Sequence, residues 1–149
     1  MKIEAADSAD HLELSDLTKL SKAFWGYSDA QILAWDEDLT LSEAYFDNHH
    51  VYKAIDREKL IAYYSYGREN AHTVKLDNLF VHPEWIGKGI GQTLMSHFLN
   101  ELANTNYKRI VLDADPHAEK FYLKLGFHTI DQLQSSVPGR FLPIMELKI

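Results

Sequence analysis

Residues 79–95 constrain this chain more than any other segment. An apolar stretch leads into a turn with glycines at positions 87, 89 and 91, and an amphipathic stretch follows at once. Glycine adopts backbone conformations that other residues avoid, and it leaves no side chain between the turn's amides and a ligand. A helix that begins there adds unsatisfied N–H donors and a partial positive charge. The segment therefore predicts a strand, a glycine turn and a helix that together bind a phosphate group.

The spacing of these glycines excludes two common phosphate-binding motifs. A P-loop needs G-x-x-x-x-G-K-[ST], but Lys88 lies inside the glycine run and no Gly-Lys-Ser/Thr closes it. A dinucleotide-binding fingerprint needs G-x-G-x-x-G, and position 92 is glutamine. We therefore expect a phosphorylated cofactor of another class.

The same segment resembles the acyl-CoA loop of the GNAT (GCN5-related) N-acetyltransferases, which has the pattern [Q/R]-x-x-G-x-[G/A] after a central strand. Gly89 and Gly91 fill the two small positions, and Ile86 stands where the family usually has Gln or Arg. The resemblance implies that backbone donors bind the pyrophosphate of CoA, with Lys88 as a nearby charge. The implied cofactor-binding residues of the loop are Gly87, Lys88, Gly89, Ile90, Gly91 and Gln92.

A second segment, residues 113–127, resembles the family's other signature, N-x-x-A-x-x-F-Y-x-x-x-G-F. Asp115 is a predicted N-cap before Pro116, and Gly126 is a predicted helix stop. The likeness covers residues 50–130 well and the first forty poorly. Ser21–Tyr27 and Pro138–Pro143 also resemble small bacterial members of unassigned substrate, which makes Ile86 a feature of that branch.

The rest of the sequence predicts an α/β chain. Arg57-Glu58 is a predicted tight hairpin turn, and no linker or repeat interrupts residues 1–149, so we expect one GNAT N-acetyltransferase domain. The order of elements matches the GNAT acyl-CoA N-acyltransferase fold, which implies a central mixed, mostly antiparallel sheet flanked by helices. The predicted strands are 2–6, 51–56, 59–66, 73–81, 109–113, 127–133 and 141–148. The predicted helices are 10–24, 29–37, 42–47, 91–104 and 116–125.

Composition limits the partners. The net charge is −7, from 15 basic and 22 acidic residues, and no dense Lys/Arg run is present, so we expect no nucleic-acid partner. The absence of cysteine excludes disulfides, thiolate metal sites and an acyl-cysteine intermediate. The eight histidines lack ligand spacing, so we expect no metal.

No leader opens the chain and no apolar run approaches the ~20 residues that span a bilayer, so we expect no membrane partner and a cytoplasmic location.

Acetyl transfer to an amine needs a held thioester, a neutral amine, oxyanion stabilisation and a proton for the leaving thiolate. The resemblance implies that main-chain groups of Leu79, Phe80 and Val81 hold the pantetheine arm, with one N–H polarising the thioester carbonyl. It implies that Tyr122 contacts CoA and serves as general acid, because the family's tyrosine lies near the sulfur. It also implies a pantetheine contact for His117; an exposed histidine of the first helical turn is the alternative.

The candidates for general base are Asp77 and Asp113, acting directly or through water, with His72 as a weaker third choice. Strand-end carboxylates or caps are the alternative interpretation of both aspartates. A lysine-like amine with a pKa of about 10.4 costs roughly 4–5 kcal/mol to neutralise at pH 7, whereas an α-amine near 7.8 costs only about 1 kcal/mol. An α-amine acceptor would therefore need no dedicated base.

In this fold the early helices and the last hairpin line the acceptor side. The predicted substrate-binding residues are Lys22, Trp25, Tyr27 and Arg140, with Lys22 or Arg140 holding a carboxylate; solvated surface charge is the alternative. The predicted function is direct transfer of acetyl from acetyl-CoA, a co-substrate, to a primary amine of a small molecule, an amino acid or a protein N-terminus. The alternative is a CoA-binding regulatory or sensor module without turnover. A homodimer through the C-terminal strands and an acyl chain longer than acetyl stay open.

Overall fold

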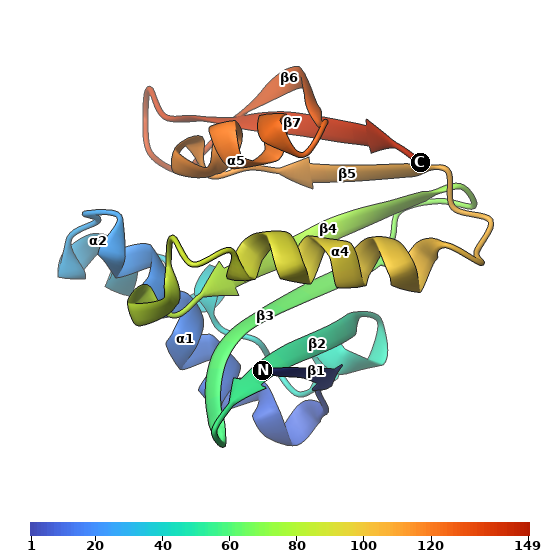
Figure 1. Ribbon diagram of the computed structural model, residues 1–149. Coiled ribbons are helices and arrows are strands. Elements are labelled where there is room, and N and C mark those ends of the chain that lie inside the picture. Colours follow the sequence, from blue (N-terminus) through green and yellow to red (C-terminus); the bar gives the residue numbers. More distant parts are fainter. The chain divides into compact units, whose positions relative to one another are not determined.

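The computed structural model describes residues 1–149 and divides into two compact units. Unit 1 consists of Met1–Tyr66 and Asn78–Ala103, and unit 2 of Gly67–Asp77 and Asn104–Ile149. Seven strands form a sheet in the order β1-β2-β3-β4-β5-β7-β6 (Figure 1). Strand β4, Thr73–Val81, contributes its first residues to unit 2 and its last four to unit 1.

Three antiparallel strands begin unit 1: β1 (Lys2–Ala5), β2 (His50–Asp56) and β3 (Lys59–Arg68). Arg57 and Glu58 join β2 to β3 with φ angles of +48° and +67°. Two consecutive positive φ angles are typical of the tight turn that matches the twist of a two-stranded hairpin. The predicted hairpin at Arg57-Glu58 is confirmed.

The helices of unit 1 agree with the predicted ones, apart from the second. The α-helices are α1 (His11–Phe24), α2 (Asp29–Ala34), α3 (Asp36–Leu39) and α4 (Ile90–Leu102). Single turns of 3-10 helix are η1 (Ser8–Asp10), η2 (Ala44–Asp47) and η3 (Pro83–Trp85). The predicted helix 29–37 is two short helices, because Trp35 leaves the helical conformation (φ −93°, ψ 9°) and buries its ring at 8% exposure.

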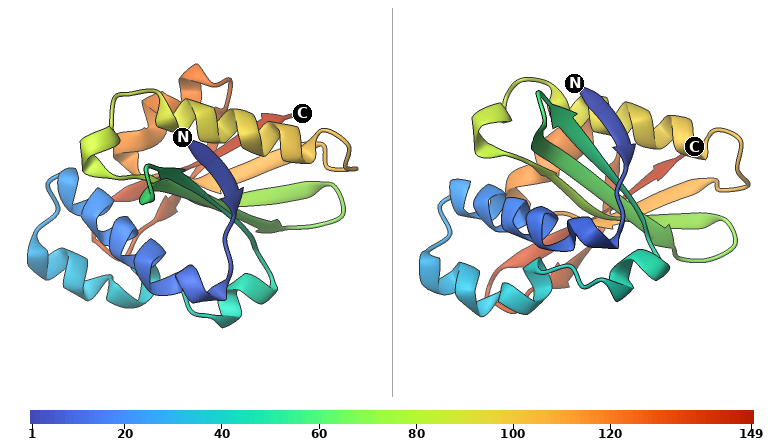
Figure 2. Two further views of the ribbon diagram at one scale, coloured as in Figure 1. Left: turned by 60° about the horizontal axis from the view of Figure 1, so that its bottom comes forward. Right: turned by 90° about the horizontal axis from the view of Figure 1, so that it is seen from below.

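Helices α1 and α4 lie on opposite faces of β2 and β3 (Figure 2). Successive side chains of a strand point to opposite faces. Accordingly Tyr63 belongs to the core cluster that includes Leu14 and Leu17 of α1, whereas Tyr64 and Tyr66 contact Phe98 of α4 at ring-centroid distances of 5.4 and 4.7 Å. Burial of each such side chain stabilises the fold by about 1.5–3 kcal/mol, so β3 anchors both helices.

Unit 2 is built on a parallel pair and an antiparallel hairpin. Its elements are β5 (Arg109–Asp113), η4 (Pro116–Ala118), α5 (Glu119–Lys124), β6 (His128–Gln134) and β7 (Phe141–Lys148). Strand β5 is parallel to the first residues of β4 and antiparallel to β7, which pairs with β6. The predicted helix 116–125 begins as a 3-10 turn, and Gly126 ends it with a φ of +98°. The predicted α/β fold with a mixed, mostly antiparallel sheet and flanking helices is confirmed.

Replacing Phe98 with alanine should lower the free energy of unfolding by about 3–5 kcal/mol, because the fully buried ring would leave a cavity. Its neighbour Leu99 is 36% exposed, so Leu99→Ala should change that free energy by less than about 1 kcal/mol. Urea denaturation followed by circular dichroism measures both variants. Equal losses would contradict the assignment of Phe98, and not Leu99, to the core face of α4.

Candidate functional site

The glycine turn before α4 depends on left-handed backbone conformations. Gly87 and Gly89 have φ angles of +82° and +80°, and Gly89 is the N-cap residue of α4. An added Cβ would meet no atom within 4 Å at either position, so the backbone conformation, and not a lack of space, requires glycine. The turn therefore presents bare main chain beside open space.

The first turn of α4 presents hydrogen-bond donors that have no acceptor within the helix. Its first helical hydrogen bond runs from the Thr93 amide to the Gly89 carbonyl at 3.1 Å, so the amides of Ile90, Gly91 and Gln92 precede it. No side chain caps this end, and the first turn holds no acidic residue. The partial positive charge of the helix is thus not offset locally, which favours an anionic ligand.

The glycine turn itself carries one cation, and the segment before it adds a capping histidine. The Lys88 ammonium lies 5.1 Å from the centroid of the Trp85 ring, a cation–π contact that keeps the charge beside the turn. His82 caps η3 by accepting a hydrogen bond from the Glu84 amide at 3.1 Å. Ile86 is extended and half-buried, and its aliphatic side chain offers no polar group to a ligand.

The last residues of β4 continue beyond the pairing with β5. That pairing joins Thr73–Lys75 to Arg109–Val111, and the residues that follow on β4 have no partner on β5. Leu79, Phe80 and Val81 are half-buried, and Phe80 packs against the unit 1 core with its ring centroid 5.9 Å from that of Tyr63. The side chains of these residues are thus partly buried while their main chain has no pairing with β5, and the predicted pantetheine contact stays a prediction.

The predicted acceptor residues of unit 1 lie partly together. The Lys22 ammonium is 5.8 Å from the ring centroids of both Tyr27 and Trp35, and 5.9 Å from that of Phe80. Trp25 packs edge-on against Phe24 instead, at 5.1 Å, and is 42% exposed. No local sequence signal connects Lys22 to Phe80, because strand β4 brings the phenyl ring to α1 from far along the chain.

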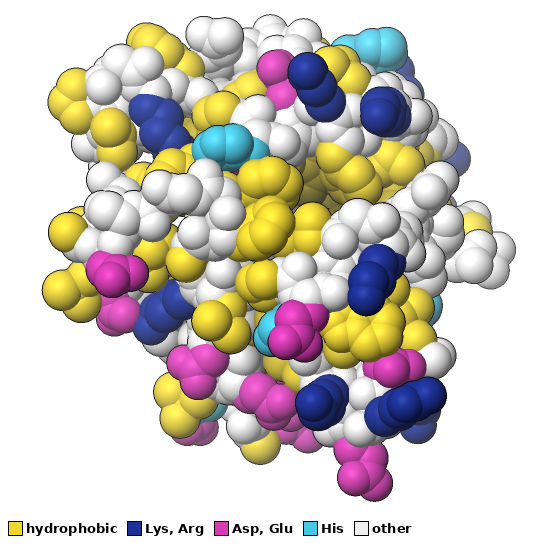
Figure 3. Space-filling view, turned by 60° about the vertical axis from the view of Figure 1, so that its left-hand side comes forward, with side chains coloured by type: hydrophobic (Ala, Val, Ile, Leu, Met, Phe, Trp, Pro, Cys, Tyr) yellow, Lys and Arg dark blue, Asp and Glu magenta, His cyan; other side chains and the backbone are white.

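Charges of both signs mix on the surface of unit 1. In the lower part of Figure 3, where α1 and the first strands lie, Asp and Glu side chains stand among Lys and Arg. Lys53 pairs with Asp10 at 3.0 Å, and Lys2 pairs with Glu4 at 3.0 Å. Partly exposed pairs of this kind contribute little to stability, and they break up any large single-sign field.

In unit 2, the ring of Tyr122 is buried. It packs edge-on against Phe121 and Phe127 at centroid distances of 5.0 and 5.4 Å. Burial raises the pKa of the phenol above its ordinary value, so the group is protonated at neutral pH. The whole residue is 7% exposed, so the phenol is largely enclosed.

The two predicted bases differ in their surroundings. Asp113 accepts a hydrogen bond from the Lys75 ammonium at 3.0 Å. Burial alone would lower the pKa of Lys75, but the hydrogen bond and the charge of Asp113 outweigh it and raise that pKa. Asp113 is therefore engaged in an ion pair, whereas Asp77, on β4, is exposed.

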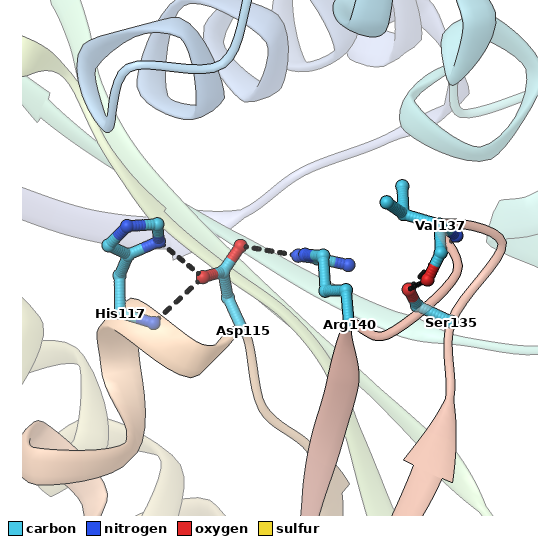
Figure 4. Close-up of polar contacts among 5 residues, drawn as sticks. All are labelled: Asp115, His117, Ser135, Val137 and Arg140. Carbon is cyan, nitrogen blue, oxygen red and sulfur yellow. Dashed lines mark hydrogen bonds and ion pairs between the residues drawn. The ribbon is translucent and has the colours of Figure 1, made fainter.

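Asp115 joins two of the predicted site residues (Figure 4). Its Oδ1 accepts hydrogen bonds from the backbone amide and from Nδ1 of His117, both at 2.9 Å, and its Oδ2 accepts one from Arg140 at 3.1 Å. The capping pattern predicted Asp115 as an N-cap, and that is confirmed. The contact with Arg140 was not predicted, because it depends on how β5 and β7 pair.

A profile of the acetyltransferase (GNAT) domain matches residues 25–148 of the chain. This chain belongs to the GNAT acetyltransferase family. The matched range includes residues of both compact units, and the resemblance carried by the two sequence motifs is confirmed.

Curated relatives of this GNAT chain share only part of their length with it. An uncharacterized N-acetyltransferase ycf52 from Gracilaria tenuistipitata var. liui is 28% identical over 78 residues, which are 52% of this chain and 43% of the relative. Its counterpart from Porphyra purpurea is 28% identical over 69 residues, which are 46% of this chain and 40% of the relative. The matches span less than half the length of these relatives.

Solved structures show the same fold over the whole chain. The PaiA N-acetyltransferase from Thermoplasma acidophilum, in complex with coenzyme A, has a TM-score of 0.81 at 21% identity and covers 100% of both chains. YncA from Salmonella typhimurium, with acetyl-CoA, has a TM-score of 0.69 at 22% identity, over 99% of this chain and 93% of its own. At these identities the likeness concerns the fold, and the predicted GNAT fold is confirmed.

Two further properties bear on the kind of site. No group of three or more His, Asp or Glu side chains is arranged to hold a metal ion. None of the helices combines the length with the apolar character that a membrane crossing requires.

Replacing Gly89 with alanine should lower the free energy of unfolding by about 1–2 kcal/mol, because a left-handed conformation strains any residue with a Cβ. Gly91 is the matched control, since it lies inside α4 without a positive φ. Gly91→Ala should be neutral or stabilising. Urea denaturation compares the two variants, and a Gly89→Ala variant as stable as the wild type would contradict the left-handed cap.

Proposed function

We propose that this chain is an N-acetyltransferase that moves an acetyl group directly from acetyl-CoA to a primary amine, without an acyl-enzyme. The amine nitrogen attacks the thioester carbonyl carbon, the C–S bond breaks, the amine loses a proton and the thiolate gains one. One observation carries the proposal: in a GNAT family member, an uncapped helix begins at Gly89, after a turn with two left-handed glycines. The single-domain interpretation of residues 1–149 belongs to the same proposal.

Acetyl-CoA is proposed to bind as co-substrate along β4 and the start of α4. The pyrophosphate would accept hydrogen bonds from amides of Gly87–Gln92, with Lys88 adding a charge held beside Trp85. Main-chain groups of Leu79–Val81 would hold the pantetheine arm, and the amide of Phe80 or Val81 would polarise the thioester carbonyl. Solved GNAT structures with coenzyme A or acetyl-CoA support this assignment by fold.

Tyr122 is proposed to assist departure of the thiolate. Because burial raises the pKa of the phenol, the hydroxyl is present as a donor at neutral pH but releases its proton less readily than a free phenol. We therefore assign it a strong hydrogen bond to the developing thiolate, with proton transfer completed as the C–S bond breaks.

The acceptor is proposed to be a small-molecule amine, an amino acid or a protein N-terminus. Lys22, held among aromatic rings, is the proposed partner of an acceptor carboxylate, and Trp25, Tyr27 and Arg140 would complete this side. Arg140 donates a hydrogen bond to Asp115, and a bound carboxylate would compete with Asp115 for it. We propose a cytoplasmic location with no nucleic-acid partner, and a homodimer stays open.

A CoA-binding sensor without turnover is the second candidate. Half-buried Ile86 favours it, because this residue replaces the polar side chain that the family usually places at the loop. Turnover separates the two candidates, since a sensor binds acetyl-CoA without consuming it.

Gly89→Glu should weaken acetyl-CoA binding at least tenfold, because the substitution strains the turn and places a negative charge beside the pyrophosphate. Gly26→Glu is the matched control: Gly26 also has a positive φ (+93°) with open space around it, but it ends α1. Isothermal titration calorimetry measures both variants. Equal affinities for wild type and Gly89→Glu would remove the turn as the cofactor site.

Tyr122→Phe should lower kcat about 100-fold and leave the dissociation constant of acetyl-CoA within about twofold, because only the hydroxyl is lost. Thiol release with the best acceptor from an amine screen gives kcat, and calorimetry gives the affinity. An unchanged kcat would contradict the role of the phenol.

A further inference from the structure

We propose that the outer side of helix α1 is a docking surface for a basic amphipathic helix of a partner protein. This α1 surface consists of Leu12, Glu13, Asp16, Leu20 and Phe24, all of which belong to unit 1. Docking of this kind requires no acetyl transfer and is therefore independent of the proposed enzymatic function.

Three large apolar side chains of the α1 surface are exposed. Leu12, Leu20 and Phe24 are 63%, 50% and 51% exposed, whereas Leu14 and Leu17 of the same helix are buried in the core of unit 1. Helix α1 covers one face of the strands of unit 1 (Figure 2), so the exposed side chains are on the side turned away from them. Single exposed apolar residues are common, but three on one side of one helix are typical of an interaction surface.

The spacing of these residues suits the packing of a second helix. Leu12, Asp16, Leu20 and Phe24 follow one another at intervals of four residues, so they form one ridge along the helix. Ridges of this spacing pack into the grooves of another helix. At about 1.5 Å per residue the ridge is about 18 Å long, which matches roughly three to four turns of a partner helix.

The charge of this part of the chain indicates the chemistry of the partner. Residues 10–47 contain nine Asp or Glu and two Lys, so they carry the whole net charge of −7, and the rest of the chain has equal numbers of acidic and basic residues. The two lysines are engaged elsewhere, since Lys19 pairs with Asp36 at 2.7 Å and Lys22 lies among aromatic rings. An acidic surface of this kind favours a basic partner.

Glu13 and Asp16 place two of these carboxylates beside the exposed apolar side chains. The ion pairs of Lys2 and Lys53, around the first two strands, include neither carboxylate. A partner helix with leucines on one side and lysines or arginines flanking them would therefore match both the apolar ridge and its charges.

The same charge disfavours the other possible occupants of the α1 surface. A second copy of the chain would bring Glu13 and Asp16 against an equally acidic surface, and like charges across an interface weaken binding. Anionic lipid headgroups and nucleic acids carry the same sign of charge and would be repelled. A basic helix is the occupant that the charge favours.

Isothermal titration calorimetry with a synthetic peptide of leucine and lysine tests the docking. The peptide has the length of α1, 14 residues, and its leucines follow helical spacing. One control peptide has glutamate in place of lysine, and a second has the same composition with its leucines spread around the helix. The chain should bind the first peptide at least about tenfold more tightly than either control, and added salt should weaken that binding. Equal affinities for the three peptides would overturn the proposal.

Two variants locate the binding on α1. Leu20→Ser and Asp16→Asn should each weaken binding of the leucine–lysine peptide at least about fivefold, because one loses apolar contact and the other loses a charge. Leu123→Ser is the matched control, since Leu123 of α5 is 47% exposed, and it should not change the affinity. The changed side chains are exposed, so all three variants should keep the urea midpoint of the wild type. Leu20→Ser and Leu123→Ser variants of equal affinity would contradict the placement on α1.

Nitrogen-15 NMR of the wild-type chain should show that the peptide perturbs the amides of His11–Phe24. Perturbations confined to other segments would overturn the α1 surface. A dimer in light scattering that Leu20→Ser dissociates would assign the surface to a second copy, and binding to phosphatidylglycerol vesicles that Leu20→Ser abolishes would assign it to a membrane; either result would overturn the choice of partner. A chain that binds the peptide but transfers acetyl to no amine would overturn the proposed function and leave the docking surface intact.

Discussion

The apolar face of α4 is buried, and this packing fixes the position of the helix. The helix begins, without a side-chain cap, at the glycine turn that follows β4 and η3. The proposed binding of acetyl-CoA depends on that uncapped end. Leu94 and Phe98 are fully buried, and Phe98 packs on two tyrosines of β3. The helix therefore cannot shift without losing several kcal/mol of buried apolar contact. Because Gly89 accepts a left-handed conformation, the chain enters this helix without placing a side chain over its free amides. The conformation of Gly89 thus leaves the first amides of a firmly packed helix uncovered, and these amides are the proposed anion-binding donors.

In unit 2, the hydrogen bonds of one carboxylate hold three parts of the structure together. Asp115 caps η4, orients His117 and accepts from Arg140, so a single carboxylate fixes the helix start, the ring and the hairpin tip. Tyr122 lies farther along the helical segment that Asp115 caps, and its ring is buried against Phe121 and Phe127. The proposed acid thus lies on a short segment whose start depends on Asp115.

Local signals in the sequence were sufficient for much of the fold. The strands Thr73–Val81, Arg109–Asp113 and Phe141–Lys148 have their predicted bounds, and the positive φ angles at Arg57 and Gly126 fall where turn residues predicted them. The break at Trp35 was missed, since burial of the indole and not helix propensity decides it. Contacts of Arg140 with Asp115 and of Lys22 with Phe80 were missed for another reason. Each contact joins residues that are far apart in the sequence and that only strand pairing or core packing brings together. Local sequence patterns do not predict such contacts.

The central claim is transfer of acetyl from acetyl-CoA to an amine, and a coupled assay of thiol release and amine acetylation tests it most directly. Wild-type protein would be incubated with acetyl-CoA and a panel of primary amines, with and without a carboxylate, and the acetylated amine quantified by mass spectrometry. The account predicts one thiol released for each N-acetylated amine formed, with faster turnover for carboxylated α-amines. Tight acetyl-CoA binding without any acetylated amine, or thiol release without an acetylated product, would contradict it.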